Sequence, residues 1–186
     1  MTATLESPAP PRRDRPWVRW VLAAVIAVFV MMWVYVLFLA PKGGVYRVRD
    51  EAWRTSARQI CTDATARRRA LADTSEGYIS NPTPAQMVRH ADLVDQATAI
   101  LSGMLDSIDA LPLSDPKDQV RVETFLKYYR VILDDRHRYT ARLRALTLAP
   151  YDETLVLGGP VTNIVTDFTS GNDIKACVPP GELGGA

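Results

Sequence analysis

Histidine and cysteine, which often carry acid–base, nucleophilic and metal chemistry, are scarce in this sequence. Its 186 residues include two histidines, His90 and His137, and two cysteines. The chain also lacks the Gly-x-Ser-x-Gly pattern of serine hydrolases and the Gly-x4-Gly-Lys pattern of phosphate-binding loops. Neither histidine is adjacent to a cysteine, and no Cys-x-x-Cys pair is present. The sequence therefore predicts a protein that is not an enzyme, with no catalytic residues and no cofactor.

The sequence gives little support to a metal site. Asp134 and His137 are three residues apart, so that a helix would place both on one face. Carboxylate-bridged metal sites in helical bundles need such a step on several helices. His90 with Asp92 does not repeat it. We therefore expect salt-bridged surface residues here and no metal ligands.

An excess of either charge is also missing. The sequence has 22 Lys and Arg residues against 21 Asp and Glu residues, a net charge of +1. Residues 1–19 hold 4 of the basic and 2 of the acidic residues, which leaves 18 basic and 19 acidic residues, a net charge of −1, in the remainder. Because phosphate neutralisation dominates affinity for nucleic acids, a near-neutral chain is not expected to bind them.

One long apolar run stands out. From Trp20 to Ala40 the chain has 21 residues without a charge. At about 1.5 Å per residue a helix of this length spans about 30 Å, the thickness of the hydrocarbon core of a bilayer. Trp17 and Trp33 lie toward its two ends, as aromatic residues at membrane interfaces do. We predict a transmembrane helix over residues 17–40, with a buried core helix as the alternative.

This helix is expected to remain attached as an uncleaved signal-anchor. The run is longer than the apolar region of a signal peptide, Phe38 stands where cleavage needs a small residue, and Pro41 would follow the cut. Residues 1–16, rich in proline and arginine, are predicted to be a disordered cytoplasmic tail. The predicted domain then covers 41–178, and 179–186 are predicted to be a disordered tail.

The charges that flank the run do not decide its orientation. Within about 18 residues four basic residues precede it, and five follow it: Lys42, Arg47, Arg49, Arg54 and Arg58. A long domain translocates largely regardless of its charges, whereas four arginines hinder export of a short tail. We therefore predict a single-pass protein of the cell membrane, with the N-terminus in the cytoplasm and the C-terminal domain outside it.

The rest of the chain predicts three long helices. The first covers 45–71, and its apolar stripe is thin: Val45, Val48, Ala52, Ile60, Ala64 and Leu71, with Trp53 beside it. The second begins at Thr83-Pro84-Ala85-Gln86, a capping box with proline at the first helical position, and runs to about Leu111. The third begins at Asp115-Pro116 and is stopped by Pro150.

A mostly apolar seam recurs at heptad spacing in the second and third helices. Its positions are Met87, Ala91, Val94, Thr98, Leu101, Leu105 and Ile108 in the second, and Val122, Leu126, Tyr129, Leu133, Arg136, Tyr139 or Thr140, Leu143 and Leu146 in the third. The short connection between the two helices favours an antiparallel hairpin. The sequence thus predicts an all-α fold, with one N-terminal transmembrane helix plus an antiparallel three-helix bundle. Its C-terminal tail is irregular, with a short helix near 160–170.

The two cysteines are expected to pair. Cys61 lies midway along the first helix and Cys177 lies in the tail, and both follow the apolar run. In an extracytoplasmic domain this arrangement predicts a disulfide, which would attach the irregular tail to the weakly packed first helix. Two buried free thiols are the alternative.

Charges segregate along the predicted bundle. If the first helix leaves the membrane, the second returns and the third leaves again, six arginines fall near the distal end: Arg67, Arg68, Arg69, Arg89, Arg142 and Arg144. Asp106, Asp109, Asp115 and Asp118 fall near the other end. Complementing helix dipoles is one explanation. The alternative is a basic interaction surface for an acidic protein partner or an anionic envelope polymer.

The layout resembles uncharacterised single-pass membrane proteins of actinobacteria. The similar features are the Pro/Arg-rich start, the signal-anchor, Trp53 and Cys61 in the first helix, the proline-opened hairpin and the late Cys177. The resemblance implies an accessory subunit of an envelope machine, such as a lipid-uptake transporter or a respiratory supercomplex, and assigns no functional residue.

We therefore expect a non-catalytic, membrane-anchored protein that assembles with, or stabilises, a larger membrane complex of the cell envelope. The alternative is a binding module that holds a lipid or another apolar ligand between its helices. A pocket lined by Trp53, Tyr129 and Met104 would favour that alternative, and a solid core there would count against it.

Overall fold

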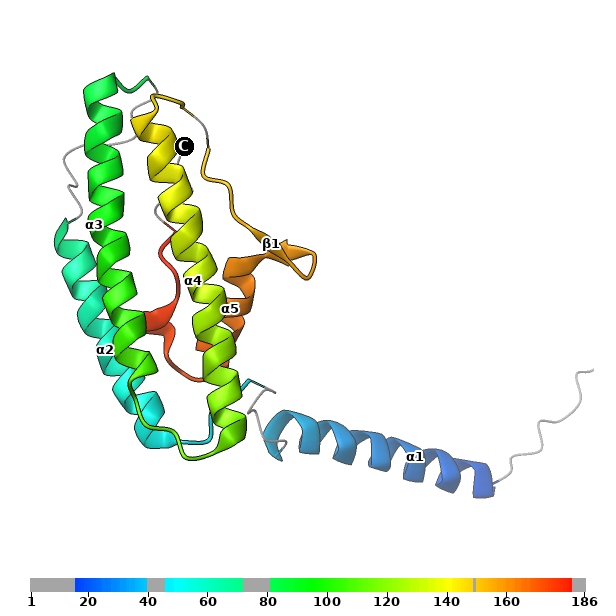
Figure 1. The fold of residues 1–186 in the computed structure, drawn as a ribbon. Coiled ribbons are helices and arrows are strands. Elements are labelled where there is room, and N and C mark those ends of the chain that lie inside the picture. The colour runs from blue at the N-terminus through cyan, green and yellow to red at the C-terminus, as the bar shows by residue number, and fades with distance from the viewer. Residues whose placement is uncertain (1–15, 40–45, 72–80, 149, 182–186) are drawn as a thin grey trace, which may run out of the picture. The chain divides into compact units, whose positions relative to one another are not determined.

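A computed structural model describes residues 16–39, 46–71, 81–148 and 150–181 (Figure 1). The chain divides into two compact units, Met1–Lys42 and Gly43–Ala186. Each is considered by itself below. The tails predicted to be disordered fall mostly on residues 1–15 and 182–186, which lie outside the described residues.

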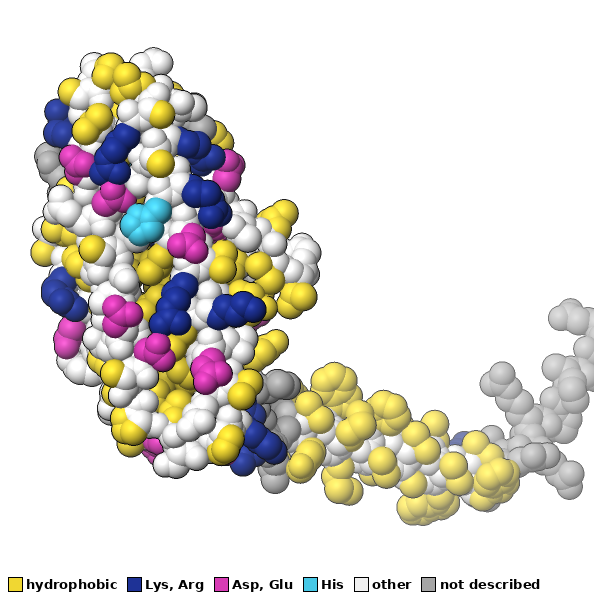
Figure 2. All heavy atoms as spheres, in the orientation of Figure 1, with side chains coloured by type: hydrophobic (Ala, Val, Ile, Leu, Met, Phe, Trp, Pro, Cys, Tyr) yellow, Lys and Arg dark blue, Asp and Glu magenta, His cyan; other side chains and the backbone are white. Residues whose placement is uncertain are grey.

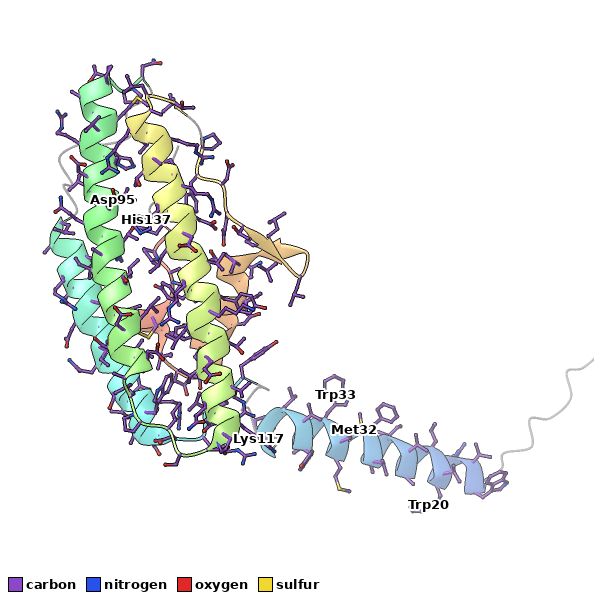
Figure 3. All side chains as sticks on the ribbon, viewed as in Figure 1. Trp20, Met32, Trp33, Asp95, Lys117 and His137 are labelled. Atoms are coloured by element: carbon purple, nitrogen blue, oxygen red, sulfur yellow. A yellow bond between two sulfur atoms is a disulfide. The ribbon has the colours of Figure 1, made fainter. Side chains whose placement is uncertain are left out.

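The first unit is a single apolar helix. Helix α1 covers Pro16–Val34 and continues through the π-helical segment η1, Tyr35–Leu39. Among the described residues, Trp17–Phe38 is one helix, 22 residues in length, long and apolar enough to cross a membrane. All its side chains from Trp17 to Phe38 are exposed (Figure 2), and Trp20 and Trp33 project from opposite sides (Figure 3). It therefore has no polar face to turn toward water.

The second unit is mostly helical, as predicted. Its long helices are α2 (Glu51–Leu71), α3 (Pro84–Asp109) and α4 (Pro116–Arg144). A hairpin of β1 (Leu155–Val156) and β2 (Gly159–Pro160) precedes α5 (Val161–Gly171) and the short 3-10 helix η2 (Lys175–Cys177). Helix α3 packs against both α2 and α4, and α5 covers α4 (Figure 1).

Local capping residues begin α3 and α4 where the sequence predicts. At α3 the Thr83 side chain accepts from the backbone N–H of Gln86 at 3.4 Å, and the Gln86 side chain accepts from that of Thr83 at 2.8 Å. At α4 the Asp115 side chain accepts from the backbone N–H of Lys117 at 2.8 Å. Proline lies in the first turn of both helices, where its missing N–H costs no hydrogen bond.

The first long helix begins later than predicted. Helix α2 starts at Glu51, and Asp50 accepts a hydrogen bond of 3.0 Å from the backbone N–H of Trp53. The buried face of α2 is Trp53, Ala57, Cys61 and Ala64. Of the predicted stripe, Ala64 lies on this face and Val48 is buried ahead of the helix, whereas Ala52 is exposed, so that the prediction was wrong at this position. The reason is that residues 46–50 are held outside the helix by long-range hydrogen bonds described below.

Helix α4 ends earlier than predicted, at Arg144 instead of near Pro150. The N–H of Thr147 bonds to the carbonyl of Arg142, and the N–H of Leu146 bonds to that of Leu143, both at 3.0 Å. This is a Schellman motif, in which the residue after the cap is usually glycine. Here Leu146 takes the left-handed conformation, with φ 55°. Without a glycine at this position, the sequence carries no signal for the end of the helix.

Replacing Leu146 by glycine should raise the free energy of unfolding by about 0.5–1 kcal/mol, because glycine adopts a positive φ without steric cost. Leu146 is 52% exposed, so that little buried apolar area is lost. Chemical denaturation of the full chain in detergent micelles measures the change. Leu148→Gly is the matched control, since Leu148 is also exposed but has no positive φ. An increase in the free energy of unfolding for both variants, or for neither, would contradict the assignment of strain to the positive φ of Leu146.

The core of the second unit is solid where the sequence allowed for an internal pocket. Trp53, Met104 and Tyr129 are at most 3% exposed and belong to one cluster of buried residues. All the predicted third-helix seam residues except Leu146 are buried. Arg136 is 2% exposed and donates from Nε to the Thr98 hydroxyl at 2.8 Å, and burial lowers the pKa of its guanidinium.

The predicted disulfide is confirmed. Cys61 of α2 and Cys177 of η2 are bonded, with their Cα atoms 5.0 Å apart and 116 residues between their positions in sequence. Both cysteines are fully buried. The bond attaches the C-terminal segment to α2, and Pro179 just beyond it is also buried.

Candidate functional site

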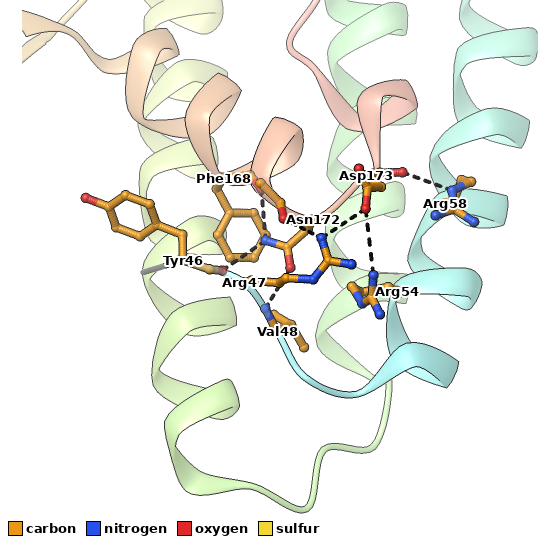
Figure 4. A network of polar contacts seen from close by, with 9 residues as sticks. Tyr46, Arg47, Val48, Arg54, Arg58, Phe168, Asn172 and Asp173 are labelled. Atoms are coloured by element: carbon orange, nitrogen blue, oxygen red, sulfur yellow. Dashed lines mark hydrogen bonds and ion pairs between the residues drawn. The ribbon is translucent and has the colours of Figure 1, made fainter. Parts of the chain in front are cut away.

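The most elaborate polar contacts of the second unit hold its first described residues, 46–50, which we call the leading segment (Figure 4). Asn172, at the end of α5, is fully buried. Its side-chain oxygen accepts from the N–H of Val48 at 2.7 Å, and its side-chain nitrogen donates to the carbonyls of Tyr46 and Phe168 at 3.0 and 2.9 Å. One buried amide therefore fixes the leading segment against α5.

A buried carboxylate fixes the same segment against α4. Asp118 is 1% exposed, and its Oδ2 accepts from the backbone N–H groups of Arg49 and Asp50 at 2.7 and 3.3 Å. Its other oxygen pairs with Arg121 at 2.6 Å. Because the buried charge is paired and hydrogen-bonded, its desolvation is compensated. Asn172 and Asp118 together are called the clamp below.

Charged side chains around Asp173 add a solvent-facing layer to these contacts. Arg47 donates to the Asp173 carboxylate at 3.0 Å, and Arg58 donates to its backbone carbonyl at 3.0 Å. Arg54 lies 3.9 Å from the carboxylate. Asp173 is exposed, so these pairs are screened by water and each contributes little to stability.

Residues held by the clamp line an apolar groove of about 530 Å³. The groove lies between the first turns of α4 and the face of α5, and Tyr46 borders it. Its lining comprises Tyr46, Pro116, Lys117, Val120, Arg121, Thr124, Phe125, Ile164 and Phe168. Phe125 and Phe168, both buried, stack with their ring centroids 4.5 Å apart. The clamp builds this groove, because Asn172 joins Tyr46 to Phe168 and Asp118 holds Arg121.

The groove has an apolar interior and a cationic margin. Val120 is 61% exposed and Tyr46 is 53% exposed, so that the groove opens to its surroundings along these two side chains. Lys117, on the first turn of α4 (Figure 3), is exposed, and its ammonium forms no ion pair with any residue the structure describes. The described lining contains no carboxylate, histidine or cysteine. This arrangement is suited to binding an apolar group next to an anion.

The six distal arginines lie on α2, α3 and α4 toward the end where α2 and α4 finish and α3 begins (Figure 1). Their environments differ. Arg142 pairs with Asp152 at 2.6 Å, and Arg144 pairs with Asp92 at 2.8 Å and with Asp95 at 2.6 Å. Burial lowers the pKa of Arg68. Arg67, Arg69 and Arg89 are exposed.

Three of the four acidic residues expected near the other end are engaged in the fold, and Asp106 is exposed. Asp118 is part of the clamp, Asp115 caps α4, and Asp109 pairs with Arg130 at 2.8 Å. Pairing and hydrogen bonding within the fold therefore offset part of the charge difference between the two ends of the unit that the sequence suggests.

His137 does not pair with Asp134 as a metal-binding step would require. It lies across the α3–α4 interface from Asp95, with Nδ1 3.5 Å from the carboxylate (Figure 3). No group of three or more metal-ligating residues occurs within the described ranges. Burial raises the pKa of Asp95, but hydrogen bonds from Arg144 and Thr140 and the nearby charges of Arg144 and His137 outweigh it, so its pKa falls below the usual range.

Asp95→Asn should lower the free energy of unfolding at pH 7 by about 1 kcal/mol, because the variant loses the charge-assisted contact to Arg144. The pKa of Asp95 is lower in the folded state than its ordinary value of 3.8. The stabilisation by the Asp95 carboxylate is therefore complete above pH 3.8 and is lost as the pH falls from there through the pKa of the folded state. The difference between wild type and variant should therefore shrink in acid. Denaturation curves from pH 7 to pH 3 test this, and Asp134→Asn, at an exposed position, should show no such trend.

Sequence reasoning missed the clamp and the groove. Asn172 and Asp118 bond to backbone groups 124 and 69 residues away, a relation that no local pattern contains. One available signal was the exposed valine at position 120, which lies off the apolar seam of α4.

Comparison of this chain with models of protein families, with curated proteins and with solved structures gives no match.

Proposed function

We propose that this chain is a membrane-anchored, non-catalytic protein that assembles with, or stabilises, a larger membrane complex of the cell envelope. The observation that carries the proposal is the apolar helix Trp17–Phe38, exposed along its whole length and joined to a separate folded unit. An apolar side chain left in water forgoes about 1.5–3 kcal/mol relative to burial. A bilayer removes this cost for every face of the helix at once.

The disulfide supports an extracytoplasmic location for the second unit. Cys61 and Cys177 account for all the cysteine in the chain, and both are used in the bond. Structural disulfides persist outside the cytoplasm and are rare within it. In this proposal the N-terminus is cytoplasmic and the single span leads to an antiparallel bundle of α2, α3 and α4, with the disulfide-tied tail alongside.

The clamp supports a positioning role. A flexible linker would let the folded unit turn freely about its anchor, whereas buried bonds from Asn172 and Asp118 order the chain from Tyr46 onward. Six residues separate Leu39 from Tyr46, and a chain of that length reaches at most about 25 Å. An accessory subunit that presents one surface to a partner in the same membrane needs a folded unit whose first residues are held in this way.

Topology is tested with single cysteines introduced into the full chain in intact cells. Ser114→Cys should react with a membrane-impermeant maleimide, whereas Ser7→Cys should react only after the membrane is opened. The native pair should remain unlabelled until reduced, because both thiols are in the bond. Full-length protein in the cytosolic fraction, or labelling of Ser7→Cys alone, would overturn the proposed anchoring and orientation.

Assembly is tested by native electrophoresis after solubilisation of the membranes in a mild detergent. The 20.6 kDa chain should migrate as part of a larger complex and co-purify with membrane proteins in fixed stoichiometry. Migration of the chain alone in its detergent micelle would contradict assembly while leaving the anchor intact.

The distal arginine surface is tested within the same experiment. Arg67→Glu with Arg69→Glu reverses two exposed charges and should change the free energy of unfolding by less than about 0.5 kcal/mol. If this surface binds the partner, the variant leaves the complex, whereas Lys127→Glu with Arg130→Glu, midway along α4, does not. Retention of both variants would mean that the arginines are simply solvated.

A second function, binding of an apolar ligand, is favoured by the groove between α4 and α5. The solid core around Trp53, Met104 and Tyr129 counts against a ligand held between the long helices there, so the groove is the candidate site for this function.

A further inference from the structure

We propose that the groove binds one acyl chain of an anionic phospholipid from the bilayer that holds the anchor, with the lipid phosphate next to Lys117. This inference rests on the proposed anchoring and gives the groove a specific occupant. The chemistry of the lining, the charge at the margin and the position of the groove in the chain all support this occupant.

The lining matches an acyl chain. A volume of about 530 Å³ lies within the range of about 300–1,000 Å³ that is typical of small-molecule sites. The stacked rings of Phe125 and Phe168 form its buried side, and Val120 and Ile164 extend the apolar surface. None of these side chains can donate or accept a hydrogen bond. The interior therefore selects an apolar group by shape and burial alone.

The margin matches an anionic headgroup. The ammonium of Lys117 has no ion pair among the described residues, so that binding of a phosphate breaks no existing pair there. Arg49, an exposed residue of the leading segment, adds a second basic side chain three residues after Tyr46, whereas Arg47 is paired with Asp173. Tyr46 combines an aromatic ring with a hydroxyl, the amphipathic character found at membrane interfaces. Basic residues next to a span draw anionic lipids, at about 1 kcal/mol for each residue near the surface.

The position of the groove points to the bilayer as the source of the ligand. Tyr46, which borders the groove, is the seventh residue after Leu39, where the apolar helix ends. The intervening chain reaches at most about 25 Å, so that lipids of the bilayer are the apolar ligands most concentrated around the second unit if the anchor spans the membrane. A lipid could then place one chain in the groove while its headgroup remains at the membrane surface.

The test uses the full chain in nanodiscs that contain phosphatidylglycerol with a photoactivatable diazirine in one acyl chain. After illumination, mass spectrometry should locate cross-links both within Trp17–Phe38 and on peptides that carry Val120 and Ile164. With phosphatidylcholine that bears the same labelled chain, cross-links within the span should persist, and those in the groove should fall about fivefold.

Two pairs of variants make the assignment specific. Lys117→Gln should reduce groove cross-linking about fivefold, whereas Lys127→Gln, an exposed lysine further along α4, should leave it unchanged. Val120→Trp should block the groove, whereas Val88→Trp, at an exposed valine of α3, should not. Yields are normalised to the cross-links within the span, and circular dichroism confirms that each variant is folded.

The outcomes separate this proposal from the one on which it rests. Cross-links within the span but none in the groove would overturn lipid binding and leave the anchor in place. No cross-links in either region would overturn both. Equal groove labelling by the two lipids would overturn the role of Lys117. Cross-linking of the groove to a helix of another protein in native membranes, in place of lipid, would identify a protein partner as the occupant and overturn the proposal.

Discussion

Removal of the Cys61–Cys177 disulfide should lower the free energy of unfolding by about 4–5 kcal/mol, one of the two largest effects expected of any change in this chain. The bond spans 116 residues, and chain-entropy estimates for a loop of this size give that value. The C-terminal segment should be affected first, because the bond is its covalent link to α2. Without the bond, the segment keeps two hydrogen bonds to α2, from Thr65 to the carbonyl of Ala176 at 3.1 Å and from Arg58 to that of Asp173 at 3.0 Å, together with the packing of Ile174.

The matched experiment compares Cys61→Ala, Cys177→Ala and the double variant by chemical denaturation of the full chain in detergent micelles. Each single variant already removes the whole bond, so the double variant should be hardly less stable than either one. Limited proteolysis should cut the double variant within 172–181 and spare the wild type. A loss below about 1 kcal/mol in all three variants would show that packing, and not the bond, secures the tail.

Asn172→Asp should be the most destabilising isosteric substitution in the second unit. It should lower the free energy of unfolding by about 3–5 kcal/mol at pH 7. The wild-type side chain donates to the carbonyls of Tyr46 and Phe168. A carboxylate cannot donate, and it would place a buried charge 3 Å or less from both carbonyl oxygens. The leading segment should therefore detach from α5, and the groove should lose its border at Tyr46.

The control for this variant is Asn163→Asp, in the first turn of the same helix, where the side chain is exposed. A negative charge near a helix N-terminus is slightly favourable, so this variant should match or exceed the wild type in stability. The deficit of Asn172→Asp should shrink in acid, because protonation removes the buried charge. Equal stability of both variants at pH 7 would mean that the clamp does not order the leading segment.

Strong local signals made parts of the fold predictable. The capping residues of α3 and α4 act within three positions of the helix start, so Thr83 with Pro84 and Asp115 with Pro116 located both boundaries from sequence alone. Heptad spacing identified the buried faces of these helices, because each depends only on the helical repeat. The disulfide was predictable because a chain with two cysteines allows a single intramolecular pair.

What the sequence determined by itself is the apolar helix, the helical character of the second unit, the starts of α3 and α4 and the cysteine pair, because each depends on composition or on contacts between near neighbours. The tertiary structure alone decided where α2 begins, because Asn172 and Asp118 bind a segment that lies 124 and 69 residues away. It also decided that Leu146 ends α4 without a glycine. The tertiary structure also decided the groove, since its lining comes from Tyr46, α4 and α5, three parts of the chain that only folding brings together.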